Sequence, residues 1–195
     1  MGFKRIVRKA AKLVLASSPE KFVNVEVAQV SAGSVLGGKT VVVTGGGRGL
    51  GLAMAEKFVS EGAKVVVSGR KEATLRKACE KLGDAASYVV ADVSEAERAG
   101  EFLDACEAKL GGRIDCLVSN AGVSLHENRF DNVTIEGFDR QFGTNMRGAY
   151  FLCREFLCRK EREKEPSGEL LVITSETGEQ AYDIPYGMTK AAMDS

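Results

Sequence analysis

The stretch GSVLGGKTVVVTGGGRGLG, residues 33–51, contains two nucleotide-binding patterns that cannot both hold a ligand. The first, G-x-x-x-x-G-K-[ST], is a P-loop pattern whose lysine is Lys39, and the second, T-G-x-x-x-G-x-G, begins at Thr44. A P-loop requires a strand before it and a helix that begins at its lysine. Here Lys39 is followed by the β-branched run 41–43, which is typical of a buried parallel strand. The order of elements therefore favours the second pattern, a dinucleotide-binding turn.

The second pattern lies between a predicted strand, 40–43, and a predicted helix, 50–60, as a dinucleotide site requires. Gly45 would let the chain turn sharply, and Gly49 would let its backbone approach a pyrophosphate. Gly51 would let the helix pack closely against the sheet. Three glycines also fit an ordinary strand-to-helix turn, so the rest of the chain has to decide between these interpretations.

Composition fits one soluble, cytoplasmic domain. The chain has 195 residues, 44% of them hydrophobic, with 27 acidic and 27 basic side chains, and this balance gives no indication of a nucleic-acid partner. Five cysteines without a C-x-x-C pair are typical of reduced packing residues, and one reactive thiol is the alternative. Because His126 is the only histidine, neither a histidine-rich metal site nor a Ser–His hydrolase triad is expected.

From residue 40 onward, strand-like apolar runs alternate with helical patterns. This alternation predicts an α/β fold with a doubly wound parallel sheet and right-handed crossovers, the Rossmann fold. We therefore predict an NAD(P)-binding domain over residues 38–195. The predicted strands are 40–43, 64–68, 87–91, 114–119 and 170–174, and the predicted helices are 50–60, 71–82, 94–110, 134–164 and one that begins near Tyr186.

Residues 1–37 are predicted to form a separate N-terminal basic helix and arm. Residues 3–14 place apolar side chains at helical spacing opposite lysines and arginines, with no acidic side chain among them. Two interpretations stay open: peripheral contact with an anionic membrane through residues 1–15, and packing against the domain or a partner subunit. The alternating valines of 23–27 suggest an added strand, and residues 31–38 suggest a linker. The sequence contains no run long and apolar enough to span a bilayer.

The end of the second predicted strand indicates which dinucleotide would bind. About twenty residues after a glycine turn, a carboxylate would accept hydrogen bonds from the adenosine ribose of NAD. The sequence there is Ser68-Gly69-Arg70. Arg70, together with Arg48 in the glycine turn, could form charge-assisted pairs with a ribose 2′-phosphate. We therefore expect NADP rather than NAD; the alternative is that both arginines are merely exposed loop charges.

Tyr186 and Lys190 are four residues apart in a segment patterned like the start of a helix, so they would share one face. A neighbouring ammonium stabilises a phenolate, which makes a tyrosine usable as an acid or base near neutrality. Ser175, at the carboxyl end of a predicted strand, could hold a substrate carbonyl or alkoxide oxygen. A lone Y-x-x-x-K pattern is weak evidence for a catalytic pair. Its position after this serine makes the evidence much stronger.

Several segments occur along the chain in an order that is specific in combination. They are Thr44-Gly45-Gly46-Gly47-Arg48-Gly49-Leu50-Gly51, Asp92-Val93, Ser119-Asn120-Ala121-Gly122, Asn145, Ser175, and Tyr186 with Lys190. Together they resemble the motifs of the short-chain dehydrogenase/reductase family, and the resemblance covers the chain from about residue 38 to its end.

The resemblance implies four catalytic residues. Tyr186 would be the general acid in carbonyl reduction, and Ser175 would orient the carbonyl. Lys190 would lower the pKa of the tyrosine and bind the nicotinamide ribose. Asn145 would kink its helix and hold a water that links Lys190 to solvent.

The resemblance also implies a cofactor-binding set. Asp92 would bond the adenine amino group, and residues 120–122 would line the cofactor pocket and brace the sheet. The alternatives are a plain helix cap for Asp92 and a turn residue for Asn120. The full set is Thr44, Gly45, Arg48, Gly49, Leu50, Gly51, Arg70, Asp92, Val93, Asn120, Ala121, Gly122, Tyr186 and Lys190.

The chain departs from the family pattern at three places. Ser119 replaces an asparagine, the segment 175–186 is shorter than is common, and the chain ends at Ser195, where family members continue with further strands and a substrate lid. We therefore expect a C-terminally truncated sheet with an exposed edge at the fifth strand, and weak or absent activity for these residues alone.

The leading hypothesis is an NADP(H)-dependent oxidoreductase that interconverts a carbonyl and an alcohol of a small molecule by hydride transfer. The alternative is a non-catalytic nucleotide-binding or scaffold protein with the same fold. The helix 134–164 and the helix beginning at Tyr186 match those through which members of the family assemble, so a homo-oligomer is expected. The sequence does not indicate which substrate is bound.

Overall fold

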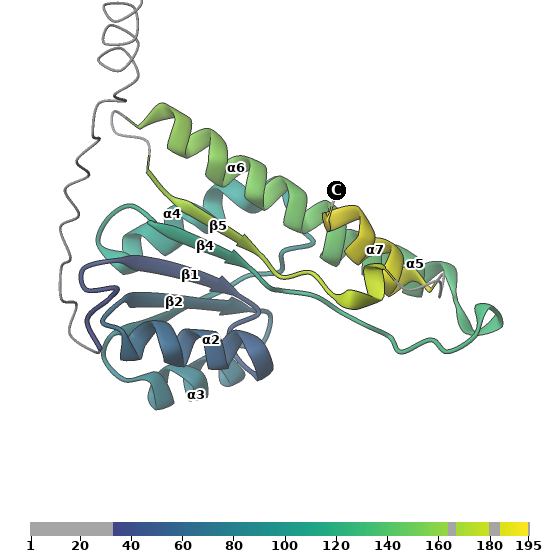
Figure 1. Ribbon diagram of the computed structural model, residues 1–195, viewed down its shortest axis with the longest axis horizontal. Coiled ribbons are helices and arrows are strands. Elements are labelled where there is room, and N and C mark those ends of the chain that lie inside the picture. The colour runs from purple at the N-terminus through teal and green to yellow at the C-terminus, as the bar shows by residue number, and fades with distance from the viewer. Residues whose placement is uncertain (1–32, 164–166, 180–183, 195) are drawn as a thin grey trace, which may run out of the picture. The chain divides into compact units, whose positions relative to one another are not determined.

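The computed structural model describes residues 33–163, 167–179 and 184–194. They form a parallel five-stranded sheet of order β3-β2-β1-β4-β5 with helices on both faces (Figure 1), which confirms the predicted doubly wound sheet. The helix and strand predicted within residues 1–32 lie outside the described residues. The strands are β1 (Thr40–Thr44), β2 (Lys64–Gly69), β3 (Ala86–Val90), β4 (Cys116–Ser119) and β5 (Glu169–Val172). The α-helices are α2 (Gly49–Ser60), α3 (Glu72–Leu82), α4 (Ala99–Leu110), α5 (Ile135–Phe142), α6 (Ala149–Arg162) and α7 (Pro185–Asp194). Short 3-10 turns are η1 (Ala96–Arg98), η2 (Phe130–Asn132) and η4 (Glu176–Gly178), and η3 (Gly143–Gly148) is a π-helical segment.

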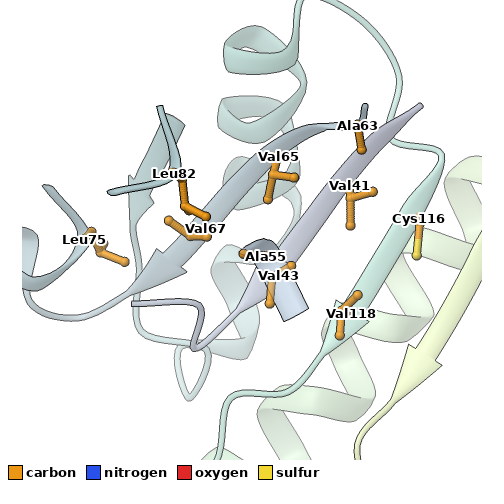
Figure 2. Close-up of a cluster of buried hydrophobic side chains, with 10 residues drawn as sticks. All are labelled: Val41, Val43, Ala55, Ala63, Val65, Val67, Leu75, Leu82, Cys116 and Val118. Atoms are coloured by element: carbon orange, nitrogen blue, oxygen red, sulfur yellow. The ribbon is translucent and has the colours of Figure 1, made fainter. Parts of the chain in front are cut away.

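The central strands are valine runs because both of their faces are buried. On one face, Val41 and Val43 of β1 pack with Ala55 of α2 and Leu75 of α3 (Figure 2). On the other face, Val42 packs in a second cluster with apolar side chains of α4 and α6. The two clusters hold the sheet between two helical layers.

The carboxyl ends of β1 and β4 mark the point where the strand order reverses. From β1 the chain moves outward to β2 and β3, then returns to β4 on the other side of β1. In open parallel sheets, ligands bind at such a reversal, beyond the carboxyl ends of the strands. The helices α5 and α7 lie side by side beyond these ends (Figure 1) and contact each other.

The predicted helix 134–164 consists of three segments in the structure: α5, the π-helical segment η3 and α6. Its predicted end lies partly outside the described residues, since α6 ends at Arg162 and residues 164–166 are not described. The predicted helix 94–110 likewise begins with the turn η1 before α4. Among the helices that the structure describes, none combines the length and apolar character needed to cross a membrane.

Lys39 and Thr40, the end of the P-loop pattern, lie at the amino-terminal edge of the sheet, as the order of elements predicted. The Thr40 hydroxyl donates to the Arg113 carbonyl (2.6 Å), and the Thr40 N–H donates to Asp115 Oδ2 (3.0 Å). The preceding turn packs on the domain, because the Leu36 N–H donates to the Glu61 carbonyl (2.8 Å). Residues 33–38, which lie in the predicted linker 31–38, therefore pack against the domain that contains the sheet.

Candidate active site

The glycine turn follows β1, and its three pattern glycines have different structural roles. Gly45 and Gly49 adopt positive φ angles, +67° and +56°, which side chains rarely tolerate. Gly51 has ordinary backbone, but a Cβ there would lie 2.5 Å from the Gly45 carbonyl oxygen and 2.6 Å from Asn120 Nδ2. A Cβ at Gly49 would have nothing within 4 Å among the described residues, so the turn is open on that side. The predicted roles of Gly45 and Gly51 thus correspond to a positive φ and a close contact.

Gly46 is a further essential glycine that the sequence analysis did not single out. A Cβ there would lie 2.7 Å from Cγ1 of Val67 on β2. The only sequence signal was the run of three consecutive glycines, of which the pattern uses just the first. The turn is therefore held against β2 as well as against β4.

Thr44 joins the carboxyl ends of β1 and β4. Its Oγ1 accepts from the N–H groups of Asn120 and Ala121, both at 3.0 Å, and donates to the Val118 carbonyl at 3.2 Å. Asn120 Nδ2 in turn donates to the Thr44 carbonyl at 2.8 Å. Thr44 is buried, and its hydroxyl is used within the protein. The Thr44 side chain thus braces the start of the loop 120–122, and the cofactor-binding roles of Thr44 and of this loop stay predictions.

The amino terminus of α2 points out of the glycine turn. Its N-cap residue, Arg48, has extended backbone and, within the part of the chain that the structure describes, does not cap the helix with its side chain. The first turn of α2 carries no acidic residue, so its N–H groups remain suited to an anion. Arg48 is exposed, and the Leu50 side chain is 73% exposed. Both residues border the opening rather than the core.

Arg70 and Asp92 lie together at the carboxyl ends of β2 and β3. Arg70 Nη1 is 3.8 Å from Asp92 Oδ2, in a partly exposed ion pair. Asp92 Oδ1 accepts from both the N–H (3.0 Å) and the hydroxyl (2.8 Å) of Ser94, so Asp92 also fixes the turn into η1. Val93, the residue after Asp92, packs directly against Gly148. A Cβ at Gly148 would lie 2.1 Å from the Val93 carbonyl oxygen. Asp92 therefore acts as a turn cap, close to the second of the two alternatives, and its bond to an adenine amino group stays a prediction.

Asn145 is buried in the π-helical segment, where its side chain connects three elements. Nδ2 donates to the Val123 carbonyl (2.8 Å) and to Thr189 Oγ1 (3.1 Å), and Oδ1 accepts from the Val123 N–H (2.7 Å). A π-helical turn interrupts the α-helical ladder, and such turns are frequent at functional sites. The structure has a π-helical segment at this residue, and Asn145 links that segment to the chain after Gly122 and to α7.

Lys190 and Tyr186 lie one turn apart on α7, as predicted. Lys190 Nζ is 5.7 Å from the centre of the Tyr186 ring and donates to the Ile173 carbonyl at 2.6 Å, just beyond β5. Lys190 is only 6% exposed, and this burial lowers the pKa of its ammonium, partly opposed by the charge of Asp194. Tyr186 is half-buried. The result is a buried cation beside a phenol, just beyond the carboxyl end of β5.

Ser175 begins the turn η4, which packs on α7. Its Oγ accepts from the N–H (3.3 Å) and the hydroxyl (2.9 Å) of Thr177. A Cβ at Gly178 would lie 2.8 Å from the Ala191 nitrogen, so η4 and α7 are in close contact. Both lone pairs of the Ser175 hydroxyl are occupied, and among the described residues no acceptor takes its hydrogen.

Comparison with known proteins assigns the family. Residues 39–195 match the family model described as short chain dehydrogenase. The chain belongs to this family.

Two relatives and one solved structure illustrate the similarity. A short-chain dehydrogenase/reductase of Pestalotiopsis microspora is 36% identical over 168 residues, which cover 82% of this chain and 61% of that protein. Trihydroxynaphthalene reductase of Colletotrichum orbiculare is 36% identical over 159 residues, 79% of this chain and 54% of that protein. A 3-ketoacyl-(acyl-carrier-protein) reductase of Brucella melitensis, in complex with NADH, has a TM-score of 0.74 and 34% identity and covers 81% of this chain and 66% of its own. This short-chain dehydrogenase thus spans 54–61% of the length of those two relatives.

The cysteines of this short-chain dehydrogenase are free thiols. Burial raises the pKa of Cys106 to about 12 and that of Cys116 to about 11, and it also raises the pKa values of Cys79 and Cys153. These four are therefore poor nucleophiles near neutrality. Among the described residues, no group of side chains is placed to hold a metal ion.

Proposed function

We propose that the chain is part of an NADP(H)-dependent oxidoreductase that interconverts a carbonyl and an alcohol of a small molecule, with Tyr186 as general acid and base. The observation that carries this proposal is the buried Lys190 ammonium, 5.7 Å from the Tyr186 ring, at the same edge of the sheet as the glycine turn. A site for a dinucleotide and a site for proton transfer then share one crevice.

The glycine turn fits a dinucleotide. Gly49 leaves its outer side open, and the amino terminus of α2 offers N–H groups and the favourable end of the helix dipole to a pyrophosphate. When bound, the nicotinamide would supply or accept the hydride, while the protein supplies position and a proton. Loop 120–122, braced by Thr44, would form the opposite wall.

Proton transfer would involve Tyr186, Lys190 and Ser175. The Lys190 cation favours the phenolate form of a neighbouring tyrosine, so Tyr186 can release and regain a proton. Lys190 uses one of its three N–H donors on Ile173, which leaves two for ribose hydroxyls. The free hydrogen of the Ser175 hydroxyl would donate to the substrate oxygen and hold it near Tyr186.

Reprotonation would use the oxygen atoms of Asn145. Both amide hydrogens of Asn145 are committed, to Val123 and to Thr189. A water that links Lys190 to solvent would therefore donate to the Asn145 backbone carbonyl or to its side-chain Oδ1. The π-helical segment supports this role because it interrupts the regular helical bonding around that residue.

The preference for NADP rests on charge at the carboxyl end of β2. This strand ends at Gly69 and is followed by Arg70, so the position after β2 supplies a cation rather than a carboxylate to a ribose, and Arg48 of the glycine turn supplies a second cation. A ribose 2′-phosphate would compete with Asp92 for the Arg70 guanidinium, and the pair is partly exposed and therefore weak. The phosphate, with its higher charge, would be the stronger partner.

The proposal extends to assembly and location. Apolar side chains stay exposed along α5 and α6, which suits contact with a second copy. They are Ile135, Phe138, Tyr150, Phe151 and Leu157. We propose a cytoplasmic homo-oligomer that uses this surface.

A binding titration and one substitution test the proposed function. NADPH fluorescence should change on binding, with tighter binding for NADPH than for NADH. In the protein, Tyr186→Phe should lower turnover by about a hundredfold or more, the usual range for a lost general acid, and leave the NADPH dissociation constant unchanged. Turnover that survives Tyr186→Phe would contradict the mechanism, and binding without any turnover in the unmodified protein would favour a non-catalytic nucleotide-binding role.

A further inference from the structure

A buried polar pair connects α5 to the segment that follows the loop 120–122. Gln141 of α5 is fully buried and Glu127 is 8% exposed, and Gln141 Nε2 donates to Glu127 Oε1 at 2.8 Å. Buried polar side chains are unfavourable unless their hydrogen bonds are made within the protein. An apolar residue at position 141 would fill the same core position without this requirement. The pair therefore needs an explanation beyond packing.

Gln141 and Asn145 both hydrogen-bond the segment 123–127, which we call the strip. Gln141 Oε1 accepts from the Leu125 N–H (3.4 Å), and one helical turn later Asn145 bonds both the N–H and the carbonyl of Val123. Positions 141 and 145 lie one turn apart on the helical segment, and the residues that they bond, Leu125 and Val123, lie two positions apart in the segment 123–127, in which His126 has a positive φ of +55°. Two side-chain amides on one helix face thus hold alternate residues of the strip 123–127.

Gly137 supports this close approach. It lies one turn before Gln141 on α5, and a Cβ there would lie 3.0 Å from Leu125 Cδ1 and 3.1 Å from Thr134 Oγ1. Glycine is unfavourable inside a helix, so its presence in this short helix fits a need for room. Thr134 also caps the helix through the Gly137 N–H at 3.0 Å. The start of α5 is therefore shaped to receive the strip.

The strip borders both parts of the proposed site. It begins immediately after Gly122, which ends the wall of the proposed dinucleotide pocket, and Asn145 also donates to Thr189, the neighbour of Lys190. A shift of the strip would move Val123 and with it the hydrogen bonds of Asn145. The position of Lys190 thus depends on how the strip is seated.

We propose that Glu127 and Gln141 are positioning residues, whose pair seats the strip 123–127 on α5 and so sets the geometry of the dinucleotide pocket and of Asn145. This inference rests on the proposed function. Neither side chain would touch substrate or cofactor; both act through Val123, Leu125 and Asn145. Glu127 Oε2 has no hydrogen-bond partner among the described residues, so the pair depends on Oε1 alone.

The test compares Glu127→Ala with the conservative Glu127→Gln, which keeps an acceptor oxygen for Gln141. Asn128→Ala is the matched control, because Asn128 is exposed and its side chain accepts only from Asn132 among the described residues. Gln141→Leu serves as a second variant should Glu127→Ala fold poorly. Two quantities are measured on each: exchange of the Leu125 and Val123 amide hydrogens by NMR, and the dissociation constant for NADPH.

We expect Glu127→Ala to speed exchange at Leu125 and to raise the NADPH dissociation constant about tenfold, the effect of removing a buried hydrogen bond and leaving Gln141 Nε2 only the Gly137 carbonyl, at 3.5 Å. The NADPH dissociation constant of Glu127→Gln should stay within about threefold of that of the unmodified protein. That of Asn128→Ala should equal that of the unmodified protein. Unchanged Leu125 exchange in Glu127→Ala and Gln141→Leu, or faster exchange with unchanged NADPH affinity, would overturn the positioning role. If the unmodified protein binds neither NADPH nor NADH, the proposed function itself fails, and the exchange data show separately whether the pair seats the strip.

Discussion

Two regions of the molecule border the carboxyl edge of the sheet. The contacts that stabilise one region differ in kind from those that stabilise the other. In the glycine-turn half, β1 to β3 with α2 and α3, the three valines of β1 are at most 2% exposed and the turn geometry is set by glycines next to one another. In the proton-transfer half, α5 to α7 with β5, every described residue of β5 is at least partly exposed, and Asn145 bonds residues 22 and 44 positions away. The first half thus depends on local backbone shape and the second on distant side-chain contacts.

This difference predicts where single changes should act. Substitutions in the glycine turn should affect folding and cofactor binding together, because backbone and ligand site coincide there. Substitutions in the proton-transfer half should affect chemistry while the sheet remains folded. Four predictions test this contrast, from the largest expected effect to the smallest.

Gly51→Ala should be the most damaging change. Its Cβ would lie 2.5 Å from the Gly45 carbonyl, a backbone atom that cannot move without distorting the turn. We expect a loss of about 3 kcal/mol in the free energy of unfolding, measured with urea, and loss of NADPH binding. Gly49→Ala is the control, since only the positive φ is strained there, and should cost about 1 kcal/mol. Equal effects of the two substitutions would contradict the assigned roles.

Thr44→Val should weaken the connection between β1 and β4. It removes the oxygen that accepts from the partly buried Asn120 and Ala121 N–H groups, of which Asn120 keeps the Val118 carbonyl as an acceptor at 3.1 Å. The expected loss is about 2 kcal/mol of unfolding free energy. Thr44→Ser keeps the oxygen and should recover most of it. If Thr44→Val and Thr44→Ser have the same stability, the hydroxyl does not brace the loop.

Arg70→Ala should change cofactor preference without changing stability. Loss of a charge-assisted pair with the 2′-phosphate should weaken NADPH binding about tenfold and leave NADH binding unchanged. Arg76→Ala, an exposed arginine on α3, is the control. An equal loss of affinity for NADPH and NADH would contradict a 2′-phosphate role for Arg70.

Lys190→Met should give the smallest effect on folding, visible as a pH dependence. Burial lowers the pKa of Lys190 below 10.5, so the folded protein binds fewer protons there than the unfolded chain in the window between the lowered pKa and 10.5. The stability of the unmodified protein should therefore rise relative to Lys190→Met as pH increases through that window. Chemical denaturation at pH 7 and about pH 10 measures the difference, with exposed Lys109→Met as control. Parallel profiles for the unmodified protein and Lys190→Met would contradict the effect of burial.

The same contrast explains what the sequence could predict. The valine runs and the glycine turn carry their structure locally, so the doubly wound parallel sheet, the sharp turn at Gly45 and the rejection of the P-loop at Lys39 followed from residue order, whereas the strand order did not. The contact of Gly46 with Val67 could not follow, because it joins two strands whose register only the folded sheet defines.

The side-chain partners in the proton-transfer half also could not be predicted from the sequence. Tyr186 and Lys190 were predicted to share a helix face, and they do. The bonds from Lys190 to Ile173, and from Gln141 to Glu127, join segments brought together only by folding. Neither glutamine nor glutamate is unusual in an amphipathic pattern, so no local signal pointed to that pair.

The central claim is that both halves serve one dinucleotide, and a crystal structure of the protein with NADPH tests it most directly. We predict the pyrophosphate at the amino terminus of α2 beside Gly49, and the nicotinamide ribose within hydrogen-bonding distance of Lys190 Nζ, with the Tyr186 hydroxyl facing the nicotinamide. A dinucleotide bound away from the glycine turn, or a Tyr186 hydroxyl directed away from the nicotinamide, would contradict it.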